Sequence, residues 1–490
     1  MQPPIPELRL RLANEEPVHP QRSWVLYWMT AFRRTRSNFA LQYARDRARQ
    51  LGKPLVILEA LRVRYRWACP RFHRFVIEGM VDNAAACQEA DVLYYPYVEP
   101  RPGAGSGLVR ELSQRACLVV SDDYPCFFHP RLVQVASRSL PARLELVDAN
   151  GLLPLRAAER TFTVAHSYRR WMQKEIPQHL SQPPADQPLD RRSTRTLPVL
   201  TALPRKISRR WPSANLPQLL AEGGLSHLPI DGAVAPTDLR GGAQTAEKLL
   251  VRFIDQRLDD YQSARNEPDK AGSSDLSAHL HFGHIGAHEI FFRIMQAERW
   301  HPQRLHKPNG KVRGFWGVSE SSEAFLDQLC TWREIGFNHC YRQPDYDQFE
   351  SLPSWALKTL DEHADDPRPF VYSLQQFERA ETHDPLWNAA QRQLLREGRI
   401  HNYLRMLWGK KILHWSKSPR QALDIMLELN NKYALDGRDP NSYSGIFWVL
   451  GRFDRAWGPE REIFGKVRYM TSENTARKHP LKQYLQRYSA

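Results

Sequence analysis

The chain has 490 residues, of which 42% are hydrophobic and 25% charged, and its formal net charge is +15 at pH 7. These values exclude an intrinsically disordered chain and allow two or three domains. The positive charge favours a polyanionic partner such as nucleic acid or a membrane surface; a soluble protein from a basic proteome is the alternative. Six cysteines without metal-ligand spacing, no signal peptide and no apolar run of about 20 residues predict a soluble, cytoplasmic protein with reduced thiols.

Residues 1–165 are expected to form an α/β domain. Short, apolar, β-rich runs occupy 23–29, 54–61, 92–98, 117–123 and 143–149, and helical segments such as 37–52 and 106–116 lie between them. Ser37 fits a helix N-cap, and Gly52 fits the stop at the end of that helix. Near-continuous apolar strands that alternate with helices predict a five-stranded parallel, doubly wound, Rossmann-like sheet.

The amino-acid composition and its periodicity change twice further along the chain. Residues 166–241, rich in Pro, Ser and Arg without a sustained period from about 176, are expected to form a linker. Residues 242–490 are expected to be helical. Leu249, Leu250, Phe253 and Leu258 lie on one helical stripe, and Ser418 before Pro419 marks another helix start.

Two motifs favour structural over functional interpretations. The segment "PGAGSG" (102–107) could cradle a phosphate, but it lacks both phosphate-loop spellings, so a plain loop is favoured. His279, His281 and His284 could bind a metal, but the spacing matches no zinc motif, so packed histidines are favoured and no metal site is predicted.

Polar residues in the helical half allow more than one chemistry. Ser274 and Ser277 precede a helix, where hydroxyl and backbone N–H groups suit an anion such as a diphosphate. Glu334 lies in an apolar segment, where it could pair with Arg333, cap a backbone group or act as a functional acid.

Two adjacent helical segments combine tryptophans with a set of polar residues that suits either a structural salt bridge or a planar heterocycle. The polar set is Asn402, Arg405, Asn430, Asp436 and Arg438. Trp408 and Trp415 are seven residues apart, about two helical turns, so both indoles project from one side. From spacing alone, core packing is favoured for these two indoles.

Taken together, these segments resemble the photolyase/cryptochrome family, specifically its class II branch of cyclobutane pyrimidine dimer photolyases. The resemblance covers most of the chain and is strongest over 242–480. The runs that carry it are "DLSAHLHFGHI", "ETHDPLWNAAQ", "IHNYLRMLWGKKILHW", "LNNKYALDGRDPNSYSGIFW" and "EREIFGKVRYM". The resemblance implies an α/β antenna domain over 1–165 and an all-α, FAD-binding catalytic domain over 242–490.

The resemblance also assigns cofactor residues. The positions matching those that hold the FAD diphosphate in the family are Tyr261, Arg265, Ser274, Leu276 and Ser277. Asn402 also falls among the cofactor-binding positions. Arg405 and Asp436 resemble the ion pair beside the isoalloxazine ring, and Asn430 resembles the side chain that faces flavin N5.

Further positions resemble those that contact the lesion and carry electrons. Glu334 is expected to contact the dimer, with Met406 and Trp448 as the apolar walls of its pocket. Arg455, Trp457 and Arg468 fall where class II members meet the duplex. Trp408, Trp387 and Trp415 match the family's electron relay, with Trp408 nearest the flavin, Trp387 in the middle and Trp415 at the surface end.

The implied function is light-driven DNA repair, in which reduced FAD transfers an electron to a flipped-out cyclobutane pyrimidine dimer and splits it. A cryptochrome-like photoreceptor and a (6-4) photoproduct photolyase are the alternatives. UV-damaged DNA is the expected partner of a monomer, and an antenna pigment, a deazaflavin or a folate, could bind the first domain or be missing. Trp332 and a shortened 448–457 segment containing Phe453 depart from the class II pattern.

Overall fold

A computed structural model describes residues 5–490, which divide into two compact units. Unit 1 comprises the chain up to Glu159 together with Ile176–Leu250 and Leu276–Arg293. Unit 2 comprises Arg160–Glu175, Val251–Asp275 and Ile294–Ala490. The chain therefore passes between the units several times, and α5 (Ala165–Leu180), α9 (Ala243–Gln256) and α12 (Ala287–Ala297) each contribute residues to both.

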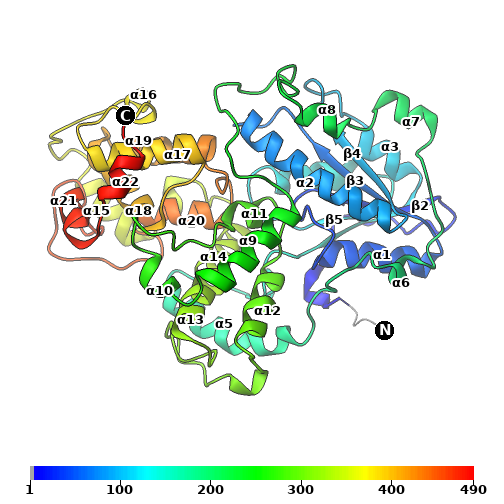
Figure 1. Ribbon diagram of the computed structural model, residues 1–490, viewed down its shortest axis with the longest axis horizontal. Helices are drawn as coiled ribbons and strands as arrows, with labels where there is room; N and C mark the ends of the chain where they lie inside the picture. Colours follow the sequence, from blue (N-terminus) through cyan, green and yellow to red (C-terminus); the bar gives the residue numbers. More distant parts are fainter. Residues whose placement is uncertain (1–4) are drawn as a thin grey trace. The chain divides into compact units, whose positions relative to one another are not determined.

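The described part of unit 1 contains a six-stranded sheet in the order β1-β6-β5-β2-β3-β4 (Figure 1). Its strands are β1 (Leu10–Leu12), β2 (Trp24–Met29), β3 (Leu55–Leu61), β4 (Leu93–Val98), β5 (Ala116–Asp122) and β6 (Leu144–Val147). Strands β2 to β6 are parallel to their neighbours and match the five predicted strands, whereas β1 pairs antiparallel with β6. The predicted fold class is confirmed, and the short edge strand β1 was missed.

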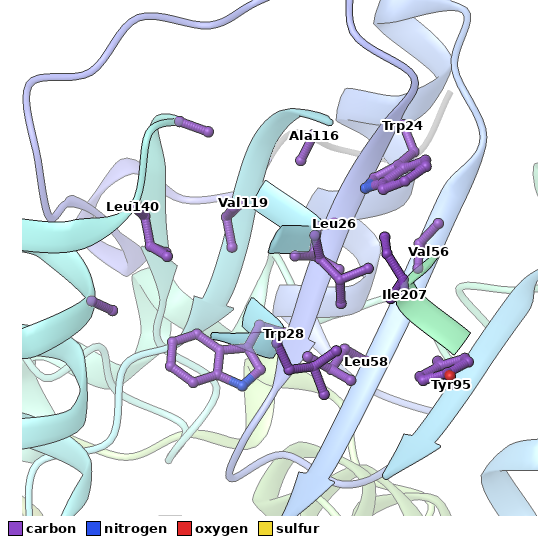
Figure 2. Close-up of a cluster of buried hydrophobic side chains, with 14 of the residues drawn as sticks. Trp24, Leu26, Trp28, Val56, Leu58, Tyr95, Ala116, Val119, Leu140 and Ile207 are labelled. Atoms are coloured by element: carbon purple, nitrogen blue, oxygen red, sulfur yellow. The ribbon is translucent and has the colours of Figure 1, made fainter. Parts of the chain in front are cut away.

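Alternate residues of the strands face opposite layers of helices. Trp24, Leu26 and Trp28 of β2 join a core with side chains of α3 (Leu108–Gln114), α4 (His129–Ser139) and α7 (Arg205–Arg210), as Figure 2 shows in part. On the opposite face, α1 (Phe39–Leu51) and α2 (Pro70–Glu89) pack on the sheet. The sheet is therefore covered on both faces, as a parallel sheet of apolar strands requires.

The start of α1 differs from the predicted N-cap. Asn38, not Ser37, caps this helix, because its side chain accepts hydrogen bonds from the backbone N–H groups of Ala40 and Leu41. Ser37 has a left-handed backbone with φ of 43° and cannot take the extended N-cap conformation. Gly52 ends the helix in the left-handed conformation, as predicted.

The motifs for which structural interpretations were favoured have partners inside unit 1. The Gly105 N–H of the glycine-rich loop donates to a Glu99 carboxylate oxygen at 3.2 Å. His279 packs at 5.0 Å from the Phe75 ring, and His284 stacks on Phe75 and accepts a hydrogen bond from the Gly242 N–H. Within residues 5–490, no group of three or more His, Cys, Asp or Glu side chains could hold a metal ion.

The predicted linker contains short helices with buried anchors. Besides α7, it includes α6 (Arg191–Thr194) and α8 (Leu216–Leu220). Ile207 and Trp211 are buried in the core of the sheet layer. Residues 176–241 therefore belong to unit 1 in full, and the domain boundaries at 165 and 242 stay predictions.

Unit 2 consists mainly of helices in its described residues, the C-terminal ones drawn yellow to red in Figure 1. Besides parts of α5, α9 and α12, they are α10 (Tyr261–Ala264), α13 (Glu320–Leu326), α14 (Arg333–Arg342), α15 (Ser354–Glu362), α16 (Leu374–Glu378), α17 (Pro385–Glu397), α18 (Asn402–Trp415), α19 (Pro419–Tyr433), α20 (Pro440–Val449), α21 (Ser472–Lys478) and α22 (Lys482–Arg487). The short α11 (Ser277–His281) belongs to unit 1.

The cysteines and the helix lengths add two simple facts. All six cysteines are free and buried. Among the described helices, none has both the length and the apolar character that crossing a membrane would take.

Candidate functional site

Helix α18 is the centre of the candidate site, with α17, α19 and α20 packed around it. Gly409 permits the approach of α20, because a Cβ added there would lie only 2.5 Å from Val449 Cγ2. The three surrounding helices each begin with proline after a capping side chain, which is Asp384, Ser418 or Asp439. The starts of α17, α19 and α20 are thus fixed by local sequence.

Arg405 and Asp436 form the predicted ion pair. Arg405 Nη2 lies 3.0 Å from Asp436 Oδ1 and 3.2 Å from Oδ2, and the two side chains are 25% and 16% exposed. The pair is therefore held in place and remains partly exposed. Asn402, the first residue of α18, is exposed one turn before Arg405.

Asn430 and Asn431, at the end of α19, are both buried. Asn430 Nδ2 donates to Ser442 Oγ at 2.8 Å, which leaves its amide oxygen as the atom able to accept from a ligand N–H. Asn431 Oδ1 accepts from the Arg438 backbone N–H, whereas Asn431 Nδ2 has no hydrogen-bond partner within residues 5–490. A buried donor without a partner is costly, so it points to an acceptor on a ligand.

The loop after α19 is fixed by a buried arginine. Arg438 adopts a left-handed backbone, with φ of 62°, and its guanidinium donates to the carbonyl groups of Asn431, Ala434 and Leu435. The carbonyls of Asn431 and Ala434 are among the acceptors that a helix leaves unsatisfied at its C-terminus, and Leu435 follows the C-cap. Arg438 thus acts structurally, and it fixes the loop that carries Asp436.

Three tryptophans form a continuous buried chain with Trp387 in the middle. The rings of Trp387 and Trp408 are stacked with centroids 6.4 Å apart, and the Trp387 Nε1 donates to the Trp408 carbonyl. Trp415 meets Trp387 edge-on at 6.2 Å. Trp415 is only 1% exposed, so the expectation that it lies at a surface end is wrong.

Glu334 lies in the first turn of α14, directly after a π-helical turn, Asp327–Trp332. Such turns are rare and occur frequently at functional sites. The Glu334 side chain is buried near Tyr168 and Cys330. The pKa values of the Tyr168 hydroxyl and the Cys330 thiol are raised well above their usual values, mainly by burial and next by the negative charge of Glu334. The Glu334 carboxyl is thus buried, with Asp327 and Arg333 also close enough to act on Cys330.

Trp448 stacks on Trp332, which the sequence analysis noted only as a departure from the family pattern. The ring centroids are 4.7 Å apart and the planes differ by 25°. Both side chains are half-buried, and their contact joins the π-helical turn before α14 to α20. Met406 is half-buried on α18, next to Arg405.

The residues predicted to meet a duplex are grouped around one carboxylate. Arg468 lies 3.1 Å from Asp454, and the Trp457 Nε1 also donates to Asp454. The guanidinium of Arg468 lies 4.4 Å from the Trp457 ring centroid and 5.9 Å from that of Trp448. The guanidinium of Arg455 also lies near the Trp457 ring, 4.7 Å from its centroid. Asp454 could not be predicted from the sequence, since a carboxylate in a basic segment gives no signal by itself.

The predicted diphosphate residues fall on both sides of the unit boundary. Tyr261 is buried on α10, and the Arg265 guanidinium lies 5.8 Å from its ring centroid. Gly272 packs on α10 so closely that an added Cβ would lie 2.5 Å from the Ala264 carbonyl carbon, which holds Ser274 near this helix. Leu276 and Ser277 lie at the start of α11 in unit 1, with Leu276 buried and Ser277 exposed.

The loop that carries Ser274 is surrounded by cations. Arg257 lies 2.9 Å from the Asp275 carboxylate and donates to the Ser273 carbonyl, and Arg399 pairs with the same carboxylate. Asp275 itself has a left-handed backbone, with φ of 61°. More guanidinium than carboxylate charge collects at this loop, which suits an anionic ligand.

Comparisons with known proteins identify the fold first. A solved class III photolyase from Agrobacterium tumefaciens matches with a TM-score of 0.67 at 17% identity, over 96% of this chain and 86% of that one. This likeness establishes the photolyase fold. No protein-family model matches the chain.

Curated relatives then identify the family. The deoxyribodipyrimidine photo-lyase of Methanothermobacter thermautotrophicus is 33% identical over 98% of this chain and 97% of its own length. Those of Arabidopsis thaliana and Potorous tridactylus are 31% and 29% identical, over 97% and 98% of this chain and 91% and 84% of their own lengths. The chain belongs to the deoxyribodipyrimidine photo-lyase family, and it is a lyase.

The cofactor that this family implies is FAD, and the residues of unit 2 fit it. The Asn431 Nδ2, which has no partner in the described part of the chain, and the available Asn430 oxygen suit the polar edge of a flavin ring, and the Arg405–Asp436 pair is partly exposed. Arg265 and the cationic loop at Ser274 suit a diphosphate.

Proposed function

We propose that this chain is a class II photolyase that repairs cyclobutane pyrimidine dimers in UV-damaged DNA. The single observation that carries the proposal is the arrangement on α18. This helix presents Arg405 to Asp436 and, three residues later, Trp408 to the buried chain of indoles. A flavin beside the ion pair would thus lie at the inner end of an aromatic relay.

The protein's residues would hold and orient the cofactor. When bound, FAD supplies a light-absorbing group that exchanges single electrons. Arg405 and Asp436 would fix the ring, and the Asn430 oxygen would accept a hydrogen bond from a ring N–H. Trp408, Trp387 and Trp415 would carry electrons inward, which keeps the cofactor in its reduced form.

Glu334, Met406 and Trp448 would form the lesion pocket. A buried carboxyl at Glu334 can donate a hydrogen bond to a pyrimidine carbonyl as negative charge develops there. A damaged dinucleotide is poorly stacked and paired, so extruding it costs less than extruding intact bases. Arg455, Trp457 and Arg468 would contact the surrounding duplex, and DNA binding would then weaken as salt rises.

A repair assay separates this function from a light-sensing role. The reduced protein is illuminated with an oligonucleotide that contains a cyclobutane dimer, and restored thymines are counted by chromatography. We expect restoration that depends on light. FAD-containing protein that restores none would support a photoreceptor, and restoration of a (6-4) photoproduct alone would support that alternative. The visible spectrum of the same sample would report any deazaflavin or folate.

Replacing Glu334 by glutamine tests the lesion contact. The Glu334→Gln protein should lose repair yield several-fold per absorbed photon, because the carboxyl group is removed while the size of the side chain is kept. FAD content, read from the visible spectrum, should not change. Glu222→Gln, at an exposed glutamate of unit 1, serves as the control. An unchanged yield in Glu334→Gln would remove this residue from the mechanism.

A further inference from the structure

The outer end of the tryptophan chain is covered by another pair of rings. Trp415 is 1% exposed, so an electron vacancy there is almost cut off from solvent. Besides Trp387, its indole meets His383 at 4.8 Å and Tyr372 at 5.8 Å between ring centroids. Both residues belong to the segment that connects α15 with α17.

Tyr372 is held against Trp415 by a backbone contact. Its backbone N–H donates to the Trp415 carbonyl at 3.0 Å, which fixes the tyrosine at the end of α18. The side chain is half-buried, whereas Trp415 is covered. His383 and His414 also contact the Trp415 ring, but Tyr372 is the tyrosine among these neighbours and the one that can give up an electron readily.

The Tyr372 hydroxyl is paired with a base. Its oxygen lies 2.6 Å from His383 Nδ1, and it also accepts from the His383 backbone N–H at 3.1 Å. The exposed Phe370 ring stacks on His383 at 3.8 Å and holds the imidazole in this orientation. His383 is exposed, so a proton received by its ring can pass to water.

A nearby cation disfavours positive charge on Trp415. The Lys411 ammonium lies 5.0 Å from the Trp415 ring centroid, and Lys411 is itself buried beside Asp384 at 3.6 Å. Removing an electron from Trp415 would place a new positive charge in a poorly solvated place, beside an ammonium whose own charge Asp384 already balances. An arrangement that moves the vacancy outward and sheds the proton is therefore favoured.

We propose that Tyr372 and His383 form the terminal electron donor of the relay, a step that rests on the relay role proposed above. When Trp415 has given an electron to Trp387, it is an indole radical cation. Tyr372 then gives one electron to Trp415 and its phenolic proton to His383 Nδ1. The products are a neutral Trp415, a neutral tyrosyl radical and a histidinium. A soluble thiolate then gives one electron to the tyrosyl radical and becomes a thiyl radical, and the histidinium returns its proton to the Tyr372 oxygen.

Electron paramagnetic resonance tests the proposal without relying on repair. Protein that contains oxidised FAD and ring-deuterated tyrosine is illuminated without added reductant, and the radicals are identified from the deuterium-dependent line shape. We expect a tyrosyl signal in the wild type. Tyr372→Phe should lose it, keep a tryptophanyl signal, and shorten the lifetime of the light-induced radicals at least tenfold. Tyr65→Phe, which removes another tyrosine that stacks on a histidine, is the control.

Removing His383, the proposed proton acceptor, distinguishes its chemical role from a purely structural one. His383→Gly should abolish the tyrosyl signal although Tyr372 is present, and imidazole added to the buffer should restore it, because position 383 is exposed. A tyrosyl signal that persists in Tyr372→Phe overturns the proposal. So does a wild type that forms only tryptophanyl radicals, in which case the relay itself stands.

Measuring radical formation and dimer repair separately shows whether the terminal donor, the tryptophan relay or the enzyme function fails. If no radical forms in the wild type, the relay and its terminal donor both fail, while repair by chemically reduced protein would still support the enzyme function. Tyr372→Phe should repair dimers at the wild-type rate once it is chemically reduced. A loss of repair in that variant would mean that Tyr372 acts elsewhere, and would overturn the assignment.

Discussion

At the scale of single residues, close backbone contacts position the candidate cofactor groups. Gly409 lets α20 approach α18, and Gly272 lets the Ser274 loop approach α10. Neither contact could be predicted from the sequence, because a glycine in a helix or a loop gives no signal of what it touches. The pairing of Arg405 with Asp436 was predictable only from the family resemblance, since the same two segments also contain Arg438 and their spacing does not choose between the two arginines.

Gly272→Ala should weaken FAD retention. The added methyl group would lie 2.5 Å from the Ala264 carbonyl carbon, and overpacking of this kind costs about 1–3 kcal/mol, which is about fivefold to 150-fold in affinity if the Ser274 loop moves. The ratio of FAD to protein after gel filtration measures the effect. Gly232→Ala, where an added Cβ meets nothing within 4 Å, is the control. Full FAD occupancy in Gly272→Ala would argue against a diphosphate at this loop.

At the scale of elements, α18 combines three tasks along one helix. It pairs with Asp436, carries two of the three relay indoles and, through Lys410, supports α20. The buried Lys410 ammonium donates to the carbonyl of Val449, the last residue of α20, and burial lowers the pKa of Lys410 from 10.5 to about 7. A lysine at this position satisfies one of the carbonyls that α20 leaves without a partner.

The stability of the wild type should rise between pH 7 and pH 9 because of Lys410. The unfolded chain keeps this proton up to a pKa near 10.5, whereas the folded chain loses it above about 7, so the unfolded state binds more protons in this range. The expected contribution is on the order of 1 kcal/mol per pH unit. Urea unfolding at several pH values measures it.

Two variants test the assignment to Lys410. Lys410→Met should flatten the rise in the free energy of unfolding, because no ammonium group is left to lose its proton. Lys358→Met, at a lysine side chain that is 77% exposed on α15, should keep the slope of the wild type. Equal slopes in Lys410→Met and the wild type would assign the dependence to other groups.

How much of each element could be predicted depended on how local its signal is. The spacing within "RMLWGKKILHW" predicted a helix with both indoles on one side, and α18 confirms it. The burial of Trp415 could not be predicted, because Tyr372 and His383, which cover it, lie more than 30 residues earlier in the chain. The capping Asn38 was missed for the opposite reason, since its neighbour Ser37 gives an equally good local signal.

At the scale of the whole molecule, apolar runs predicted the parallel strands. The packing of residues 176–241 into unit 1 could not be predicted, because only single apolar residues of this segment enter the core. Ile207, on the short α7, and Trp211, directly after it, fill the core from a segment with no periodicity to detect. The three-residue β1, which contains Arg11, was missed because edge strands have weak patterns. The groups of residues that form the two units follow spatial contacts, so a single cut in the sequence could not reproduce them.

Unit 1 should lose stability as the pH falls below about 6.5. Burial is the main cause that lowers the pKa of His73 to about 4 and of His129 to about 3. The unfolded chain therefore binds more protons than the folded chain between these values and 6.5. Each histidine should cost on the order of 1 kcal/mol per pH unit across that window, measured by denaturant unfolding.

His73→Gln offers a direct check on the acid sensitivity. The variant should show a weaker fall in unfolding free energy between pH 6.5 and pH 5 than the wild type, because one buried imidazole no longer titrates. His227→Gln, at an exposed position, should fall as steeply as the wild type. If His73→Gln and the wild type fall equally, the acid sensitivity arises from other groups.

Because every cysteine is buried, chemical labelling of the cysteines can report when the protein unfolds locally. A thiol-alkylating reagent should label native protein at none of these sites, since buried thiols are protected from reagents. Cys69, Cys87, Cys117 and Cys126 lie in unit 1, whereas Cys330 and Cys340 lie in unit 2. Mass spectrometry of briefly alkylated samples can therefore time the opening of each unit separately, with no engineered label. Thiol reductants can also feed electrons to the protein without making mixed disulfides at its surface.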